Sequence, residues 1–173
     1  MNDMTRRATP FLIAGSVFLL DYFTKWIIRA NLAAWDTIQV IPGLFNIVHS
    51  ENPGIAFGLL AEVSSAWRDV FLIGFSICVL IVISTILLRT GPRAAHTALL
   101  RGGLSFVLGG AFGNLFDRIM HGTVTDFVEV HAAQHFFPAF NVADSAITVG
   151  ACLLLLDMWR TREGGSQAAN VTR

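Results

Sequence analysis

The sequence has little charge of either sign. Asp, Glu, Lys and Arg make up only 14% of its 173 residues, whereas they make up about a quarter of a typical soluble domain. Hydrophobic residues make up 54%, and the 12 basic residues are balanced by 12 acidic ones. Without a net positive charge, no basic surface is expected that could hold nucleic acid. The composition excludes an ordinary soluble domain and an RNA- or DNA-binding protein, and it predicts a membrane protein with one domain.

Cysteine and the common hydrolase motifs are scarce too. Cys78 and Cys152 lie within apolar runs, where we interpret them as small buried hydrophobic residues rather than as a disulfide pair or zinc ligands. Neither a G-x-S-x-G nor an HExxH motif occurs. His131 and His135 stand four residues apart near Glu129, as metal ligands can, but the aromatic residues that follow are more typical of a membrane interface. The sequence therefore predicts no metal or other cofactor.

Four stretches are long and apolar enough to cross a bilayer, which takes about 20 residues. The clearest runs from Val70 to Leu88 and contains no charged residue. The other three include a few polar residues and cover residues 10–28, 98–116 and 139–159. The fold class that we predict is a mainly α-helical membrane protein with four transmembrane helices.

Basic residues are distributed unevenly around these spans. Most lie before the first span, between the second and third, and after the fourth: Arg6, Arg7, Arg89, Arg93, Arg101, Arg160, Arg162 and Arg173. Because basic loops stay in the cytoplasm, both chain ends are predicted to be cytoplasmic, and residues 161–173 are predicted to form a disordered tail. The first span could also be a cleaved signal peptide, but Asp21 and Lys25 stand where its cleavage region would be, which favours a retained anchor.

The outer connections carry strand patterns. Residues 37–41 and 44–48 flank a Pro42-Gly43 turn and are typical of a hairpin. Residues 123–130 alternate between two faces, as a strand does. We therefore expect a small β platform on the outer, periplasmic surface of the membrane.

Polar residues gather at one end of the predicted spans. An ionisable group at membrane depth costs at least a few kcal/mol, so each is a candidate functional residue. Asp21 and Lys25 are four residues apart and can pair on one helix face, although Lys25 could instead extend to the lipid headgroups. The candidates near the outer ends are Asp21, Asn52, Asn114, Asp117, Arg118, Asp126, Asn141 and Asp144.

The third span combines a polar face with small residues. Asn114, Asp117 and Arg118 are spaced to share one helix face, where they could bind a substrate or form a structural network that holds the outer loops. Small residues allow helices to approach closely. We interpret the glycines of this span as a helix-packing stripe: Gly102, Gly103, Gly109, Gly110 and Gly113.

Asp126 and Asp144 are the strongest catalytic candidates. Taken singly, Asp126 could be a turn residue, and Asp144 could be an acid that caps the fourth helix. If the two carboxyls meet, they cannot both ionise easily and share one proton. One then acts as a base toward water while the other polarises a carbonyl, which is the chemistry of an aspartic protease.

Five motifs, in this order along the chain, resemble those of the bacterial lipoprotein signal peptidase (signal peptidase II) family. They are LDYFTK at 20–25, NPGIAFG at 52–58, GGAFGNLFDR at 109–118, GTVTDF at 122–127 and FNVADS at 140–145. The resemblance runs from about residue 10 to 160. Departures such as Pro53 and Thr125 fall at positions where variation is expected to be tolerated.

The resemblance implies an aspartic endopeptidase of the bacterial inner membrane, with its active site near the periplasmic face. Its substrates would be prolipoproteins, cut just before a diacylglyceryl-modified cysteine within the lipid membrane, and globomycin would inhibit it. Asp126 and Asp144 would form the catalytic dyad, Asp117 would orient Arg118, and residues 51–60 could form a lid. The substrate-binding or supporting residues would be Asp21, Lys25, Asn52, Gly54, Gly110, Asn114, Asp117, Arg118, Asn141 and Ala143.

Two alternatives belong to other classes of protein. A small proton- or ion-conducting protein could use Asp21, Asp117 and Asp144 as relay sites, but it should place acids through the whole membrane depth, and here the centres of the spans carry none. A non-catalytic assembly factor would share the fold and could be distinguished only by an activity assay.

Overall fold

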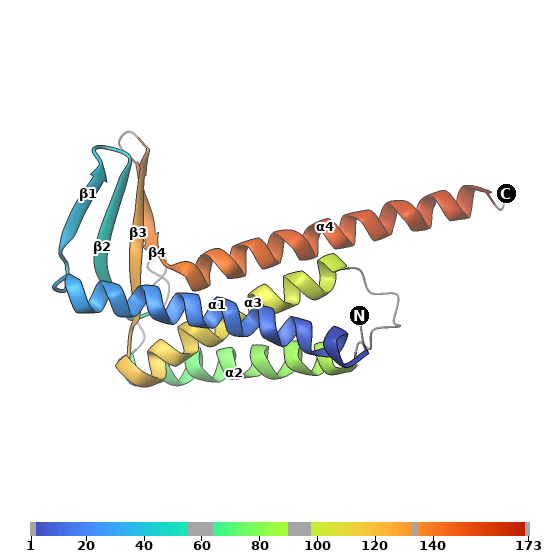
Figure 1. Cartoon of the computed structure of the whole chain (residues 1–173), viewed down its shortest axis with the longest axis horizontal. Helices are drawn as coiled ribbons and strands as arrows, with labels where there is room; N and C mark the ends of the chain where they lie inside the picture. Colours follow the sequence, from blue (N-terminus) through green and yellow to red (C-terminus); the bar gives the residue numbers. More distant parts are fainter. Residues whose placement is uncertain (1–2, 55–63, 90–97, 133–134, 172–173) are drawn as a thin grey trace.

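The fold consists of four long helices and one small sheet (Figure 1). A computed structural model of the chain describes residues 3–54, 64–89, 98–132 and 135–171. In chain order the elements are α1 (Asp3–Asn31), β1 (Thr37–Ile41), β2 (Phe45–Asn52), α2 (Ser65–Arg89), α3 (Ala98–His121), β3 (Val124–Ala132), β4 (His135–Phe140) and α4 (Val142–Val171).

The prediction of four transmembrane helices is confirmed. Each helix contains a stretch that is long and apolar enough to cross a bilayer: Arg7–Asn31, Ala66–Arg89, Ala98–His121 and Val142–Arg162. Large hydrophobic side chains such as Phe71, Phe75 and Leu155 are exposed on their outer surfaces. Water would make such a surface unfavourable, whereas lipid covers it without cost. The chain is a multi-pass membrane protein.

Helix α3 lies at the centre of the bundle, and its glycines set how closely the other helices approach. A Cβ atom on Gly103 would lie 2.8 Å from the carbonyl oxygen of Gly150 in α4, and one on Gly109 would lie 2.6 Å from that of Ala14 in α1. Either contact would force the helices apart. The packing prediction is confirmed for Gly103, Gly109 and Gly110, where the backbone of α1 or α4 rests directly on α3, but not for Gly102, where an added Cβ would meet only Leu153 at 3.9 Å.

The strands form one antiparallel sheet in the order β1-β2-β3-β4. The predicted hairpin is confirmed, and Gly43 at its turn has a φ of 73°, a conformation that favours glycine. The strand β4 was not predicted, because we expected an interfacial aromatic belt followed by a span that starts at residue 139. The sequence does not indicate this strand because Pro138 interrupts it, and proline cannot donate a hydrogen bond to a neighbouring strand. Proline is tolerated in an edge strand, and β4 lies at the edge of the sheet.

Two other expectations differ from the structure. Cys78 and Cys152 are exposed rather than buried, because an apolar run in a membrane helix can face lipid as well as the protein interior. Helix α4 continues through Val171, where we expected a disordered tail from residue 161. Extending an existing helix adds one hydrogen bond per residue fixed, which is easier than starting a new one. Of the expected lid, residues 55–60 lie outside the described part of the chain.

The sheet stands at one end of the bundle (Figure 1). Helices α1 and α3 end there and α4 begins there, whereas the start of α1 and the end of α4 lie at the opposite end. This arrangement brings the ends of α1 and α3 and the start of α4 next to the sheet.

Candidate active site

Asp126 and Asp144 line the same cavity at the sheet end of the bundle. Asp126 lies on β3 and Asp144 lies in the first turn of α4. The cavity has a volume of about 700 Å³. Its other lining residues are Asn52, Gly54, Leu72, Arg118, Phe137, Pro138, Ala139, Phe140, Ser145, Thr148 and Val149. The wall is mostly apolar, with a few polar groups among the carboxyls.

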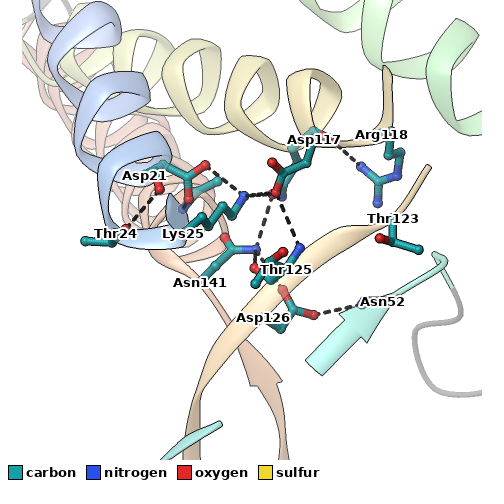
Figure 2. Close-up of polar contacts among 12 residues, drawn as sticks. Asp21, Thr24, Lys25, Asn52, Asp117, Arg118, Thr123, Thr125, Asp126 and Asn141 are labelled. Carbon is teal, nitrogen blue, oxygen red and sulfur yellow. Dashed lines mark hydrogen bonds and ion pairs between the residues drawn. The ribbon is translucent and has the colours of Figure 1, made fainter. Parts of the chain in front are cut away.

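The carboxyl of Asp126 is held between two asparagine side chains. Asn52 Nδ2 donates to Asp126 Oδ2 at 3.0 Å, and Asn141 Nδ2 donates to Asp126 Oδ1 at 2.7 Å (Figure 2). Asn52 is itself fixed, because its Oδ1 accepts a hydrogen bond from the backbone N–H of Gly54 at 2.8 Å. Both oxygens of Asp126 therefore have defined positions.

Burial and the nearby charge of Asp144 raise the pKa of Asp126 to about 6, although the hydrogen bonds from Asn52 and Asn141 act in the opposite direction. The side chain is 3% exposed. A carboxyl with this pKa can hold or release a proton near neutral pH, which is what a general acid or base needs.

This raised pKa predicts how stability changes with pH. The pKa is 3.8 without these effects and about 6 in the folded protein, so folding takes up a proton between these values and stability falls as the pH rises through them. Relative to Asp126→Asn, we expect the wild-type protein to lose about 3 kcal/mol between about pH 4 and 6. Thermal unfolding in detergent across this range measures the difference.

Asp144→Asn is the control, because removing the neighbouring negative charge should lower the pKa of Asp126 and reduce the loss. A stability difference between wild type and Asp126→Asn that stays constant with pH would contradict the prediction.

Asp144 both caps α4 and contacts the cavity. Asn141 Oδ1 accepts from the backbone N–H of Asp144 at 2.9 Å, and Asp144 Oδ2 accepts from the backbone N–H of Asn141 at 3.3 Å. This reciprocal pair is a capping box. The other oxygen, Oδ1, accepts from Asn114 Nδ2 at 2.7 Å. The capping role that we considered for Asp144 is thus present together with its place in the cavity wall.

Lys25 lies behind the two carboxyls and is completely buried, with 0% exposure. Its Nζ is 2.8 Å from Asp21 Oδ2 and 3.0 Å from Asp117 Oδ2, and it donates to Asn114 Oδ1 at 3.0 Å. The predicted pair with Asp21 is confirmed, and the alternative that Lys25 extends to the headgroups is wrong. Two carboxylates and an amide satisfy the ammonium group, so burial is possible.

Asp21 connects this ion pair to the start of α4. Its Oδ1 accepts from the backbone N–H of Ala143 at 2.9 Å. Ala143 is completely buried, and a Cβ atom on Gly113 would lie only 2.5 Å from Asp21 Oδ2. The carboxylate of α1 therefore caps α4, in space that a glycine of α3 leaves open.

Asn114 and Asn141 join Lys25 to the cavity. Asn114 Oδ1 accepts from Lys25 Nζ at 3.0 Å and from Asn141 Nδ2 at 3.3 Å. Since its oxygen faces these donors, the amide nitrogen of Asn114 points toward Asp144. The ammonium group thereby fixes which way this amide is turned.

Asp117 pairs with basic residues of α1, whereas the expected partner was Arg118. Its Oδ1 lies 2.6 Å from Arg29 Nη2, and its Oδ2 lies 3.0 Å from Lys25 Nζ. Arg118 instead donates from Nη1 to the carbonyl oxygen of Asn114 at 3.3 Å. The Nε of Arg118 is buried and has no hydrogen-bond partner among the described residues. A donor in this state is available to a ligand in the cavity.

Three residues that hydrogen-bond one another next to Asp126 were not among the predicted site residues. Arg29 Nε donates to Thr125 Oγ1 at 2.9 Å, and Thr125 Oγ1 donates to Glu51 Oε1 at 3.0 Å. Arg29 could have been found, because it follows Lys25 by four residues and shares its helix face. Glu51 and Thr125 carried no such signal. Thr125 is 0% exposed, so the expectation that this position tolerates variation does not agree with its packing.

Glu51 is an acceptor for several donors. Burial alone would raise its pKa, but hydrogen bonds from Thr123, His49 and Thr125 together lower the pKa below its usual value. His49 Nε2 lies 2.8 Å from Glu51 Oε1, and its Nδ1 lies 2.9 Å from the carbonyl oxygen of Leu32. Glu51 therefore connects β2 and β3 to the end of α1 as a carboxylate.

Glu129 and His131, two of the residues with metal-ligand spacing, form hydrogen bonds with the side-chain amide of Asn46. Asn46 Nδ2 donates to Glu129 Oε2 at 2.9 Å, and His131 Nε2 lies 2.7 Å from the same oxygen. Hydrogen bonds from Asn46 and His131 lower the pKa of Glu129. The side chain of His135 lies outside the described part of the chain. Within that part, no three His, Cys, Asp or Glu residues gather as metal ligands would.

Comparison with known proteins places this geometry in context. The model of the signal peptidase (SPase) II family matches residues 13–160. A lipoprotein signal peptidase of Solibacter usitatus (strain Ellin6076) is 46% identical over 174 residues, which cover 99% of this chain and 100% of that protein. The one from Pseudomonas aeruginosa (strain UCBPP-PA14) is 43% identical, covering 92% of this chain and 93% of its own.

Solved structures agree with the fold. A bacterial membrane enzyme determined by the in meso method at 2.3 Å resolution has a TM-score of 0.78 and 30% identity, and the match covers 91% of each chain. A second such enzyme, at 1.9 Å resolution, has a TM-score of 0.75 and 31% identity over 87% of this chain and 92% of its own.

Proposed function

The chain belongs to the signal peptidase II family, and from this membership we propose that it is an aspartic endopeptidase that acts on diacylglyceryl-modified prolipoproteins. It cleaves just before the lipidated cysteine and releases the signal peptide. The observation that carries the proposal is the common cavity of Asp126 and Asp144, each of which accepts a hydrogen bond from an asparagine amide. No nucleophilic side chain or metal is needed for this chemistry.

The burial of the dyad favours one shared proton. Burial and the nearby negative charge of Asp144 raise the pKa of Asp126 to about 6. Two carboxyls that line one cavity cannot both ionise easily, so a single proton held between them is the least costly state.

In the mechanism, the ionised member of the dyad takes a proton from a water molecule, which attacks the scissile carbonyl. The protonated member donates a hydrogen bond to the carbonyl oxygen and stabilises the negative charge that develops there. The C–N bond then breaks as the member that took the proton from water passes it to the leaving nitrogen of the lipidated cysteine, which frees the signal peptide with a new carboxyl end. Asn52, Asn114 and Asn141 keep the carboxyl oxygens in place. The free Nε of Arg118 binds the substrate backbone or the polar part of its lipid.

The position and walls of the cavity fit a substrate that is itself anchored in the membrane. Leu72, Phe137 and Val149 give the cavity an apolar side that suits a signal peptide or a lipid chain. Because enzyme and substrate share one bilayer, membrane partition already concentrates and partly orients them. The cavity lies at the end of the bundle, where water can reach it.

The basic residues define the orientation that we propose. The start of α1 and the end of α4 lie at the end of the bundle opposite the sheet (Figure 1). Most basic residues lie toward this end of the helices, among them Arg7, Arg89, Arg101, Arg160 and Arg162. The enzyme therefore sits in the inner membrane with both chain ends in the cytoplasm and the cavity on the periplasmic side.

The ion pairs weigh against the ion-conducting alternative. Asp21 and Asp117 are both held by Lys25, and Asp117 also binds Arg29. Both carboxylates have fixed partners, and neither is among the residues that line the cavity. The contacts favour a structural role for these two residues and leave proton chemistry to the dyad.

Incubation of the purified protein with a diacylglyceryl-modified prolipoprotein tests the proposal. We expect a product that begins with the lipidated cysteine, no cleavage of the same prolipoprotein without its lipid, loss of activity with globomycin, and full activity in excess chelator. Absence of cleavage by folded, membrane-inserted protein would overturn the proposed activity. Activity that disappears with chelator would overturn the aspartic mechanism.

A further inference from the structure

Thr125 is the residue before Asp126, and its side chain is completely buried. Its hydroxyl accepts a hydrogen bond from Arg29 Nε at 2.9 Å and donates one to Glu51 Oε1 at 3.0 Å. Its backbone N–H donates to Asp117 Oδ2 at 3.3 Å. Each polar group of this residue other than its carbonyl is thus bound by a charged side chain.

The three charged partners come from three different elements. Arg29 lies at the end of α1, Glu51 on β2 and Asp117 on α3, and Thr125 itself lies on β3 (Figure 2 shows Asp117, Thr125 and Asp126 together). Arg29 and Asp117 also bind each other at 2.6 Å. Two helices and two strands are therefore joined at this one residue.

Glu51 holds β2 and β3 in their pairing. It lies directly opposite Thr125 in the antiparallel register of β2 and β3. Glu51 Oε2 also accepts from the hydroxyl of Thr123, and Oε1 contacts His49 Nε2 at 2.8 Å. Hydrogen bonds to an ionised carboxylate are stronger than those between neutral groups, so this contact resists a shift of β3 along β2.

The anchoring of Thr125 sets the direction of Asp126. Successive side chains of a strand point to opposite faces, so fixing the hydroxyl on one face directs the next carboxyl to the other. That carboxyl sits between Asn52 and Asn141 at 3.0 and 2.7 Å. A displacement of about 1 Å in a catalytic group can reduce the rate about a hundredfold. The hydroxyl therefore controls a distance that the chemistry depends on.

We propose that Thr125 is a positioning residue of the active site, through the contacts of its hydroxyl with Arg29 and Glu51. It touches neither the substrate nor the reacting atoms. It holds β3 so that the carboxyl of Asp126 meets that of Asp144 at the correct separation. This inference rests on the proposed proteolytic function and adds to it a residue whose effect is on turnover rather than on substrate binding.

Thr125→Val tests the proposal, because it keeps the shape of the side chain and removes the hydroxyl. We expect kcat for a lipidated prolipoprotein to fall about ten- to a hundredfold while KM changes less than about threefold, and we expect Thr125→Ser to restore most of kcat. The matched control is Thr85→Val. Thr85 lies on α2 and its hydroxyl donates only within the helix, to the carbonyl oxygen of Ile81, so its loss should leave kcat unchanged.

A double-mutant cycle with Glu51→Gln tests whether the effect passes through Glu51. If it does, the combined variant is little slower than Thr125→Val alone, because Glu51→Gln removes the charge that strengthens a hydrogen bond which Thr125→Val has already removed. The side chain of Glu51 is 26% exposed, so Glu51→Gln is expected to fold even if Thr125→Val does not, and it should lower kcat by itself.

Asp126→Asn in the same assay separates the two proposals. If Asp126→Asn is inactive and Thr125→Val keeps the wild-type kcat, the positioning role is wrong and the proteolytic function stands. If Thr125→Val changes KM and not kcat, the positioning role is also wrong. If its effect adds fully to that of Glu51→Gln, the contact with Glu51 is not part of the positioning role. If Asp126→Asn is fully active, the proposed function itself fails.

Discussion

Asp126→Asn and Asp144→Asn are each expected to lower the rate of prolipoprotein cleavage about a hundredfold to ten-thousandfold, because general acid–base catalysis by a positioned group contributes about 10²–10⁴. Asparagine has nearly the same shape as aspartate but can neither take nor release a proton. The two losses should not add in the double variant, since either change already disables the shared-proton pair. Single-turnover cleavage of a lipidated prolipoprotein measures both effects.

The control for these variants is that the protein remains folded. Asp126 and Asp144 each accept hydrogen bonds on both carboxyl oxygens, and because asparagine has only one side-chain oxygen, each variant keeps one of its two bonds. The amount inserted in the membrane is therefore measured for each variant, and cleavage is compared per inserted molecule. If either variant cleaves at more than about a tenth of the wild-type rate, that residue cannot be the base or the acid of the reaction.

Lys25→Met is expected to destabilise the protein by about 3–5 kcal/mol, because it leaves buried charge without its partner. Asp21 Oδ2 and Asp117 Oδ2 lie 2.8 and 3.0 Å from the ammonium group, and methionine cannot replace its charge. Asn114 also loses the donor that orients its amide. The apparent melting temperature in detergent measures the loss, and cleavage activity should fall with it.

The combined variant Lys25→Met/Asp21→Asn is the matched control. It removes one positive and one negative charge, so it should recover part of the lost stability even though it carries more changes. An equally stable Lys25→Met protein would show that the ion pairs contribute little. A combined variant less stable than Lys25→Met alone would show that Asp21 acts mainly as the cap of α4, through Ala143.

The sequence indicated most of the fold because membrane helices leave a strong local signal. A run such as Val70 to Leu88 has few alternatives to a transmembrane helix, and Pro42-Gly43 between two β-branched runs marks a hairpin. The strand β4 left no such signal, since Pro138 interrupts it and its partner β3 provides the pairing. The outward-facing cysteines were misjudged for a related reason, because hydrophobicity does not distinguish lipid contact from burial in the protein.

For the candidate site, the sequence identified residue types but not their partners. Asp21 and Lys25 could be paired because four residues of helix separate them. The contacts of Arg29 with Asp117 and Thr125 join residues that are 88 and 96 positions apart in the sequence. The periodicity of a helix or strand predicts only contacts between residues that are close in the sequence. For the same reason, the sequence could not show that Asp117 binds α1 instead of its neighbour Arg118.

Lys25 is the only lysine in the sequence, and its ammonium group has no exposure. An acylating reagent such as a succinimidyl ester should therefore not modify this side chain while the bundle is intact. As the helices separate, the amine becomes accessible and leaves its carboxylate partners Asp21 and Asp117. The rate of acylation at this single position, followed by mass spectrometry, would thus report how often the interior of the bundle opens, without any label having to be introduced.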